Sequence, residues 1–472
     1  MTDLQFWNDT RIHEALNLMS ENITETSFSG ISTDSRSVRE GEVFVALIGG
    51  NFDGHDFVLS AVEQGAGGVV VSCSVNIEEG RIPVYHVEDT LEALGNLARY
   101  RRRELDITVV AITGSSGKTG TKDLTQAAIE PCYESHCTVG NQNNRIGVPL
   151  TLLSAPENTQ VVVLEIGTSE PGEIEVLTQI AEPHIGVVTT VSESHTEKLG
   201  SLDGVMKEKM ELFRGLSAGA TALVGGDPQI LSTKAKEVIK NTLVIGTGSH
   251  TDVSYRPSQI KMEESGCCNF SWRGERIALQ VPGMHSVQNA LMALAISDLL
   301  DVPVSTAAEG ISSVRASEMR MEMMEMGGIT LILDCYNANP QSVKSALDLL
   351  AVIKPGRPKI AFLGSMLELG SNSDQLHRRV LSQAMLLDVD LVVATGLFSL
   401  ESSVEKTKKN TKSPRLVSVL DPQKAYEKVR DQIRGDEVLL LKASRGVNLE
   451  KLIPFFEADF GTKGTSVDGG ES

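Results

Sequence analysis

Short apolar runs recur along the chain, and turns or helix-forming segments separate one run from the next. In the middle of the chain they cover residues 108–113, 161–166 and 185–190. Runs of this kind, without alternating polar positions, are typical of parallel strands that are buried on both faces. The same pattern returns later, at residues 330–333, 359–363, 391–394 and 438–441. It predicts an α/β protein with two parallel, doubly wound units.

The N-terminal part has strands of its own, predicted at residues 43–47 and 68–71, with glycine-rich turns between them. It closes on a helical segment, residues 90–104, whose leucines fall on one face. Arginines crowd the end of this helix, and we interpret them as a solvated helix end: Arg99, Arg101, Arg102 and Arg103.

Looser alternation marks residues 243–281, where turn residues interrupt the apolar positions. It predicts a small antiparallel excursion, and a helix follows at residues 286–300. The end of the chain is made of glycine, hydroxyl and acidic residues, a composition typical of disorder. The predicted N-terminal, central and C-terminal domains and the disordered tail cover residues 1–105, 106–313, 314–460 and 461–472.

Composition narrows the class of function. The 472 residues include 43 Lys and Arg against 62 Asp and Glu, a formal net charge of −19. That charge argues against nucleic acid or an anionic membrane surface as a partner, whereas a small phosphorylated ligand needs only local positive groups. The six cysteines form no disulfide framework, and neither a secretory signal nor a membrane-spanning run is visible. We expect a soluble protein of the reduced cytoplasm.

Candidate chemistry begins where the strand at 108–113 ends. The sequence Gly114-Ser115-Ser116-Gly117-Lys118-Thr119 joins this strand to a helix-forming segment. Backbone N–H groups of such a loop converge on phosphates, the lysine neutralises the β and γ oxygens, and the threonine hydroxyl reaches Mg²⁺. The loop is shorter than a full Walker A motif, because Ile112 stands where that motif has its first glycine. We interpret it as a phosphate loop rather than a plain glycine turn.

Two further positions suggest a metal. Glu165 ends a buried strand, in the crevice where parallel sheets bind ligands, and beside a phosphate loop this favours an Mg²⁺ ligand over a capping acid. Residues 201–216 predict a helix with Lys209 on its apolar face and Glu208 pointing elsewhere. Either Lys209 snorkels or pairs with a carboxylate, or CO₂ carbamylates it to an anion that binds Mg²⁺. His195 could reach the same metal or be purely structural.

Taken together, these motifs resemble the Mur ligase family. After the phosphate loop come Gly140-Asn141-Gln142-Asn143-Asn144-Arg145-Ile146-Gly147 and Leu164-Glu165-Ile166-Gly167. Further matching segments, which extend the resemblance from about residue 30 to 447, are 32–36, 44–47, 53–55, 194–201, 334–340 and 363–370. More specifically, they resemble the member that adds D-alanyl-D-alanine to UDP-N-acetylmuramoyl-tripeptide. The resemblance implies an N-terminal UDP-sugar domain, a central ATP-binding domain and a Rossmann-like C-terminal domain.

The resemblance also implies an ATP-dependent amide ligase of peptidoglycan precursor synthesis, working as a monomer through an acyl phosphate. ATP would be held by Gly114, Ser115, Ser116, Gly117, Lys118, Thr119, Gly120, His285, Asn289, Arg320 and Asp334. Mg²⁺ would be bound by Thr119, Glu165, His195 and a carbamylated Lys209. The substrates, UDP-N-acetylmuramoyl-tripeptide and D-alanyl-D-alanine, would contact Ser32, Asp34, Ser35, Arg36, Asn141, Asn143, Asn144, Lys442 and Arg445. Catalysis would depend on Lys118, Lys209 and His195.

Four positions depart from the family pattern, in the adenine-side motif, two C-terminal motifs and the phosphate loop: Ser286, Ser365, Ala443 and Gly120. They leave three alternatives open beside the activity just described. The chain could be another Mur ligase, a folylpolyglutamate-like ligase, or a degenerate relative that binds UDP-muramyl ligands without catalysis. Retention of the phosphate-loop lysine and of the candidate metal ligands favours an active enzyme.

Overall fold

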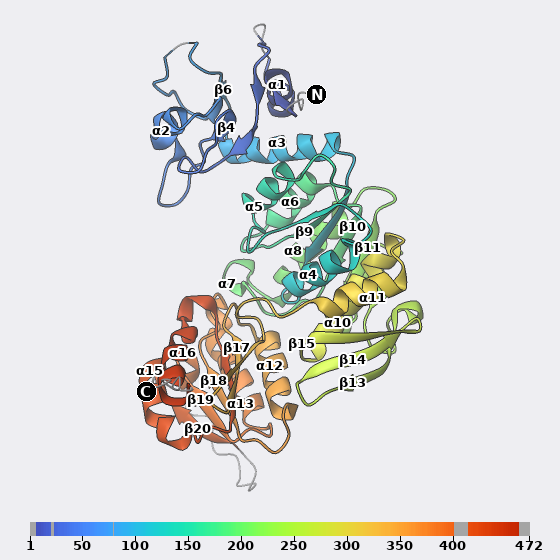
Figure 1. The fold of residues 1–472 in the computed structure, drawn as a ribbon, viewed down its shortest axis with the longest axis vertical. Coiled ribbons are helices and arrows are strands. Elements are labelled where there is room, and N and C mark those ends of the chain that lie inside the picture. The colour runs from blue at the N-terminus through green and yellow to red at the C-terminus, as the bar shows by residue number, and fades with distance from the viewer. Residues whose placement is uncertain (1–5, 20–22, 79, 401–413, 462–472) are drawn as a thin grey trace, which may run out of the picture.

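Figure 1 shows three units that follow one another along the longest axis of the molecule. The computed structural model describes residues 6–19, 23–78, 80–400 and 414–461, so the predicted disordered tail falls almost entirely outside the described residues. The predicted three-domain α/β fold is confirmed, because each unit has its own mainly parallel sheet. The predicted boundaries fall between α3 (Thr90–Glu104) and β7 (Thr108–Thr113), and between α11 (Val304–Ser313) and β16 (Glu322–Met326).

The N-terminal unit is a four-stranded parallel sheet with a two-stranded antiparallel ribbon. In their order across the sheet, the parallel strands are β3 (Gly30–Ser32), β4 (Glu42–Val45), β5 (Gly68–Val71) and β6 (Val84–His86). The ribbon pairs β1 (Trp7–Asn8) with β2 (Ser27–Phe28). The helices of this unit are α1 (Asp9–Leu16), α2 (Val58–Glu63) and α3. Both predicted strands and the predicted helix are confirmed.

The prediction of a solvated helix end is wrong for Arg101 and Arg102 of α3, whereas the side chains of Arg99 and Arg103 are exposed. Arg101 is buried and its guanidinium donates a 2.9 Å hydrogen bond to the carbonyl oxygen of Ala155. Arg102 donates to the carbonyl oxygens of Ala181 and Glu182, and Arg103 pairs with the Glu182 carboxylate. The arginines therefore tie α3 to the central unit. Arg101 and Arg102 satisfy carbonyl groups at or just after the ends of α5 (Gly147–Leu153) and α6 (Glu173–Ala181), and Arg103 adds an ion pair.

The central unit is a six-stranded parallel sheet. Its strands, in order across the sheet, are β12 (Leu243–Ile245), β11 (Thr221–Gly225), β10 (Ile185–Val188), β7, β9 (Val161–Glu165) and β8 (Ser135–Cys137). All residues of β9 and β10 are buried, which explains the apolar run that precedes Glu165 in β9 and the absence of charged side chains in β10. The helices are α4 (Lys118–Ile129), α5 (Gly147–Leu153), α6 (Glu173–Ala181), α7 (Thr196–Leu199), α8 (Leu202–Arg214), α9 (Gln229–Val238), α10 (Met284–Leu299) and α11.

The predicted antiparallel excursion exists but is shorter than residues 243–281. Its three strands are β13 (Ser258–Met262), β14 (Cys267–Trp272) and β15 (Glu275–Pro282). The first residues of the predicted segment form β12, which joins the edge of the parallel sheet beside β11. A three-residue apolar strand gives too short a pattern to separate an edge parallel strand from the start of an antiparallel one.

The C-terminal unit is a six-stranded sheet in which only the first pair is antiparallel. Its strands, in order across the sheet, are β16, β17 (Ile329–Asp334), β21 (Val438–Lys442), β18 (Lys359–Leu363), β19 (Leu391–Ala394) and β20 (Arg415–Ser418). The helices are α12 (Pro340–Val352), α13 (Ser373–Ala384), α14 (Leu397–Leu400), α15 (Pro422–Val429) and α16 (Ile453–Phe460). Within the described residues, no helix combines the length and apolar character that crossing a bilayer requires.

The arrangement of the two large sheets determines where a site can form. In the central sheet, the candidate residues follow the carboxyl ends of the adjacent strands β10, β7 and β9. In the C-terminal sheet, they follow the carboxyl ends of the adjacent strands β17, β21 and β18. Carboxyl edges of parallel sheets are where α/β proteins bind ligands. Both edges contribute to one cavity of about 880 Å³ between the two domains.

Candidate active site

The phosphate loop forms the floor of the cavity, between β7 and the start of α4. Gly114 has a φ of +154°, and a Cβ atom there would lie 1.9 Å from the Thr189 hydroxyl. Gly117 has a φ of +82°, and a Cβ there would lie 2.6 Å from the Asn289 side-chain oxygen. Only glycine fits both positions, so the loop backbone can approach a ligand closely where the N-terminus of α4 begins.

Lys118 is folded back over its own loop. Its ammonium donates a 2.7 Å hydrogen bond to the carbonyl oxygen of Gly114. Removal from water lowers the pKa of Lys118, the charge of Glu165 opposes this effect, and the charge of Arg320 adds to it. The lysine is therefore held at the phosphate loop, where the negative charge of Glu165 from the central domain and the positive charge of Arg320 from the C-terminal domain both act on it.

Glu165 is the centre of a small group of oxygen and amide side chains. It is 2% exposed, and its two carboxylate oxygens accept hydrogen bonds from the Thr119 hydroxyl at 2.7 Å and the Asn143 amide at 2.8 Å. Its backbone N–H donates to the Thr138 hydroxyl. Among the described residues, no three His, Cys, Asp or Glu side chains gather as a ready-made metal cage. One carboxylate beside a hydroxyl suits Mg²⁺, which keeps waters and phosphates as its other ligands.

Lys209 is buried on α8, as its place on the apolar face predicts. Burial lowers its pKa well below the usual value, the charge of Lys118 acts in the same direction, and Glu208 opposes it. Within the described part of the chain, the Lys209 ammonium has neither an ion pair nor a hydrogen bond. The prediction that Glu208 points elsewhere is wrong, because its carboxylate is buried and accepts from the N–H groups of Gly172 and Ile174.

His195 precedes α7 and faces the C-terminal domain. Its Nδ1 atom lies against the carboxylate of Glu368, which sequence reasoning did not select as a functional residue. This close contact with His195 lowers the pKa of Glu368. Both side chains line the cavity.

The C-terminal wall of the cavity carries a tyrosine whose ring is close to two arginines. The guanidinium carbon of Arg320 lies 3.7 Å from the Tyr336 ring centroid, and that of Arg445 lies 5.3 Å from it. Cations over an aromatic face are attracted by the ring quadrupole, so Tyr336 positions both arginines. Beside them, Lys442 is 1% exposed and forms a 2.9 Å ion pair with Asp334. The Lys442 ammonium is therefore already paired within the protein, and a substrate would have to compete with Asp334 for it.

The adenine-side motif opens α10. Burial lowers the pKa of His285. Asn289 packs on the phosphate loop, and a Cβ at Gly120 would lie 2.7 Å from its amide nitrogen, which explains the glycine at this departure from the family pattern. Ser286, another departure, donates its hydroxyl proton to the carbonyl oxygen of Pro282. Its hydroxyl therefore links the first turn of α10 to the end of β15.

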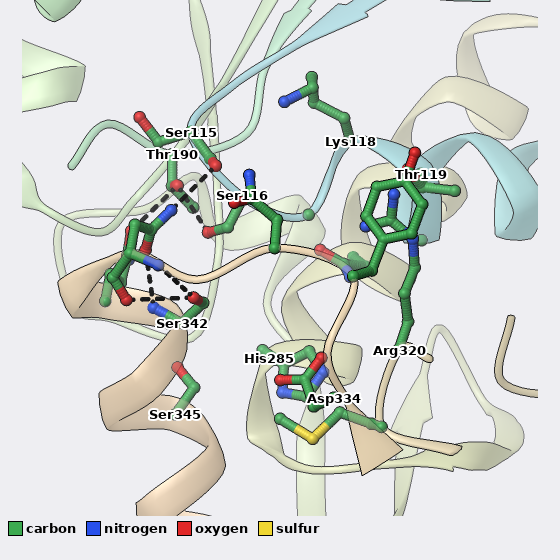
Figure 2. A pocket seen from close by; sticks show the side chains of 18 of the residues that line it. Ser115, Ser116, Lys118, Thr119, Thr190, His285, Arg320, Asp334, Ser342 and Ser345 are labelled. Carbon is green, nitrogen blue, oxygen red and sulfur yellow. Dashed lines mark hydrogen bonds between the residues drawn. The ribbon is translucent and has the colours of Figure 1, made fainter. Parts of the chain in front are cut away.

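Hydrogen bonds join the phosphate loop directly to the C-terminal domain. The Asn339 amide donates to the carbonyl oxygen of Ser115 at 3.2 Å, and the Thr190 hydroxyl donates to the Gln341 side chain at 3.1 Å. Figure 2 shows Ser115 and Thr190 linked in this way to the start of α12, near Ser342, and the Ser116 hydroxyl linked to that of Thr190. Asn339 is the N-cap of α12 and is buried, so a rigid helix end presents it to the loop.

The predicted substrate residues divide into two groups. Asn141, Asn143 and Asn144 line the cavity with the phosphate loop, and the Asn144 side chain also accepts from the N–H of Gly147 to start α5. The N-terminal set does not line this cavity: Ser32, which ends β3, and Asp34, Ser35 and Arg36, which follow it, lie in the N-terminal domain. There, the hydrogen bonds from Arg36 lower the pKa of the Asp34 carboxyl to about 2.

Each of the three units matches a different family model. Residues 27–102 match the model described as Mur ligase family, catalytic domain, residues 112–297 match the Mur ligase middle domain, and residues 319–445 match the Mur ligase, glutamate ligase domain. The fold is thus that of a ligase, and the chain belongs to the Mur ligase family.

Individual members of the family are similar to the chain over most of its length, in sequence and in structure. The UDP-N-acetylmuramoyl-tripeptide–D-alanyl-D-alanine ligase of Bacillus subtilis is 34% identical over 435 residues, which cover 91% of this chain and 93% of the relative. A crystal structure of MurF from Acinetobacter baumannii superimposes with a TM-score of 0.86 at 28% identity, covering 96% and 99% of the two chains. The MurF ligase from Thermotoga maritima, solved in complex with ADP, gives 0.78 at 27% identity, covering 91% and 97%.

Substitution of Gly120 tests the packing of Asn289 on the phosphate loop. In Gly120→Ala the new methyl group displaces the Asn289 amide, and we expect ADP affinity to fall about tenfold, equivalent to about 1.4 kcal/mol. Isothermal calorimetry measures this change. Gly50→Ala is the matched control, because a Cβ there meets nothing within 4 Å. If Asn289→Ala weakens ADP binding but Gly120→Ala does not, the packing account is wrong.

Proposed function

We propose that this chain is the ATP-dependent ligase that joins D-alanyl-D-alanine to the terminal carboxylate of UDP-N-acetylmuramoyl-tripeptide, releasing ADP and phosphate. The observation that carries the proposal is the match, over nine-tenths of the chain, to relatives that bear this activity in their names. The cavity supports it independently, because a phosphate loop and a basic wall from a second domain line the same space.

The chemistry requires a carboxylate to become reactive. The tripeptide carboxylate attacks the γ-phosphorus of ATP, the bond to the bridging oxygen breaks, and an acyl phosphate and ADP result. The amine then attacks the acyl carbon, loses a proton, and expels phosphate. Lys118 and the loop N–H groups compensate charge on the transferred phosphoryl group from the central domain. Arg320 adds positive charge from the C-terminal domain.

Mg²⁺ fits the oxygen ligands at the phosphate loop. Thr119 and Glu165 would hold one ion, and Asn143 fixes the Glu165 carboxylate. His195 would serve a second ion together with a modified Lys209. When bound, the metal reduces the repulsion between the phosphates and the attacking carboxylate. The side chains of Thr119, Glu165 and Asn143 are positioned without the metal, because Thr119 and Asn143 both donate hydrogen bonds to the Glu165 carboxylate.

Lys209 is suited to carbamylation. Its lowered pKa increases the neutral amine fraction, which can add to CO₂ with formation of a nitrogen–carbon bond and release of a proton. The product is an anion in place of a cation. Beside Lys118, this reverses an unfavourable interaction between like charges.

The two groups of substrate residues would bind the two ends of the same substrate. The UDP end would bind at the N-terminal set around Asp34, and the tripeptide end would reach the asparagines of the cavity. The D-alanyl-D-alanine acceptor would enter on the C-terminal wall, where Arg445 presents a guanidinium suited to a carboxylate. Action as a monomer on a cytoplasmic precursor is part of the proposal.

The departures from the family pattern do not favour a degenerate relative. Ser365 accepts a 2.9 Å hydrogen bond from the N–H of Leu397, and Ala443 is fully buried. Each of these side chains has a structural role at the end of a strand. The residues proposed for phosphate, Mg²⁺ and carbamylation are all present.

Acceptor selection tests the proposed reaction. With UDP-N-acetylmuramoyl-tripeptide and ATP, we expect phosphate release with D-alanyl-D-alanine, but none with L-lysine or meso-diaminopimelate. Lys118→Ala should abolish release while circular dichroism shows an intact fold. The proposal fails if L-lysine or meso-diaminopimelate supports release on a dipeptide precursor while D-alanyl-D-alanine supports none. Near-normal turnover in Lys118→Ala would contradict the assigned site.

Rescue chemistry tests Lys209. Lys209→Ala removes the carbamate, and we expect activity to fall by at least about a hundredfold, the scale of a lost transition-state electrostatic contact. Short carboxylic acids such as acetate should restore part of it by occupying the place of the carbamate. Phosphate release measures both effects. Full activity without added acid would show that Lys209 is only a buried structural lysine.

A further inference from the structure

The contact between His195 and Glu368 joins two domains through two unusual backbone positions. His195 has a φ of 54° and Glu368 a φ of 62°, both in the left-handed region that non-glycine residues seldom adopt. One belongs to the central domain, before α7, and the other to the loop after β18 in the C-terminal domain. Strained positions that persist in a structure cluster at functional sites.

The surrounding backbone is built for this contact. The N–H of Glu197 donates to the carbonyl oxygen of Glu368 at 3.1 Å, and the Thr196 hydroxyl donates to the carbonyl oxygen of Leu369 at 3.0 Å. Gly370 has a φ of +58°, and a Cβ there would lie 2.8 Å from the Cα of Glu197. The first turn of α7 therefore docks on a loop that only glycine allows it to approach so closely.

The Glu368 loop is anchored from its own domain as well. The N–H of Met366 donates to Nε2 of the buried His377 at 2.9 Å, and the N–H of Leu367 donates to the Ser444 hydroxyl at 3.0 Å. Glu368 is thus presented at a fixed place, although its own side chain is about half exposed.

A carboxylate on one imidazole nitrogen has a known physical consequence. It fixes the proton on that nitrogen, orients the ring, and leaves the lone pair of the other nitrogen for a cation. Here Nδ1 faces Glu368, and the described residues give Nε2 no hydrogen bond. His195 lines the same cavity as Glu165 and Thr168, which also belong to the central domain.

We propose that Glu368 is a positioning residue of the second metal site, supplied by the C-terminal domain, and that it couples metal binding at His195 to domain closure. The proposal rests on the proposed function for His195 as a metal ligand. Because Glu368 belongs to the other domain, His195 is oriented for a cation only when the domains are in contact. By thermodynamic reciprocity, a cation at His195 then favours that contact by the same factor.

Manganese titration of the full-length chain with ADP tests the metal half of the proposal. Electron paramagnetic resonance of Mn²⁺ counts bound ions and their affinities in wild type, Glu368→Ala, Glu368→Gln, His195→Ala and Glu165→Gln. We expect two classes of site. Glu368→Ala and His195→Ala should weaken the same class 10- to 100-fold, Glu368→Gln less so, and Glu165→Gln should affect the other class. Glu368→Gln keeps the side-chain shape, so it remains informative if the alanine variant folds poorly.

Glu193 provides the matched control. Its carboxylate pairs with Arg379 across the same domain boundary at 2.9 Å, and Glu193 does not line the cavity. Glu193→Gln should keep wild-type Mn²⁺ affinities. Small-angle X-ray scattering should show Mn²⁺ reducing the radius of gyration of wild type and Glu193→Gln, but not of Glu368→Ala.

The outcomes separate this inference from the proposed reaction, because neither measurement uses a UDP-substrate or an acceptor. Unchanged Mn²⁺ affinity in Glu368→Ala overturns the proposal. Equal weakening in Glu193→Gln also overturns it, since Glu368 would then act only as one of several domain contacts. Loss of ligation with D-alanyl-D-alanine, with the Mn²⁺ results as expected, would instead overturn the assigned acceptor and leave the role of Glu368 standing.

Discussion

Charge compensation inside one shared cavity is the constraint on which the rest of the structure depends. A polyphosphate and a carboxylate repel each other, and their approach has to be offset by fixed positive groups or by cations. The chain has a net charge of −19, so its positive groups must be gathered locally. The central domain contributes Lys118 and the start of α4, and the C-terminal domain contributes Arg320 and Arg445. The carboxyl edges of two sheets therefore have to meet at one cavity.

This division makes domain contact and site assembly the same event. Asn339 of the C-terminal domain holds the carbonyl group of Ser115 in the phosphate loop, and Glu368 of that domain holds the imidazole of His195. Each contact acts on a group of the central domain that is proposed to handle phosphate or metal. Closing the site also excludes water from a reactive acyl phosphate, which explains why a single-domain arrangement would serve the reaction less well.

Local patterns predicted well where the helices and strands lie and where the loop at residues 114–119 and Glu165 stand relative to them, for physical reasons. The strand at residues 108–113 is found at those positions because a strand buried on both faces leaves an unbroken apolar run. The joint burial of Glu165 and Thr119 follows from their places at adjacent strand and helix ends. Gly114 and Gly117 are recognisable because the backbone there needs positive φ and close approach.

Local patterns could not predict contacts between segments that are far apart in the sequence. The arginines in the last turns of α3 resemble a charged helix end in the sequence, but Arg101 and Arg102 donate hydrogen bonds to the carbonyl oxygens of Ala155 and Ala181. Helical spacing places Glu208 away from the apolar face of α8. Its carboxylate is nevertheless buried, because it accepts hydrogen bonds from two N–H groups at the start of α6. Tyr336 and Glu368 gain their importance only from residues in other elements or another domain.

Oxygen transfer tests the central claim, carboxylate activation in this cavity, most directly. UDP-N-acetylmuramoyl-tripeptide carrying ¹⁸O in its terminal carboxylate is incubated with the chain, ATP and D-alanyl-D-alanine, and the released phosphate is examined by mass spectrometry. Attack on the γ-phosphorus makes one carboxylate oxygen the bridge of the acyl phosphate, and that oxygen leaves with phosphate. We predict one ¹⁸O atom in each released phosphate. Unlabelled phosphate, with the amide product formed, would contradict the account.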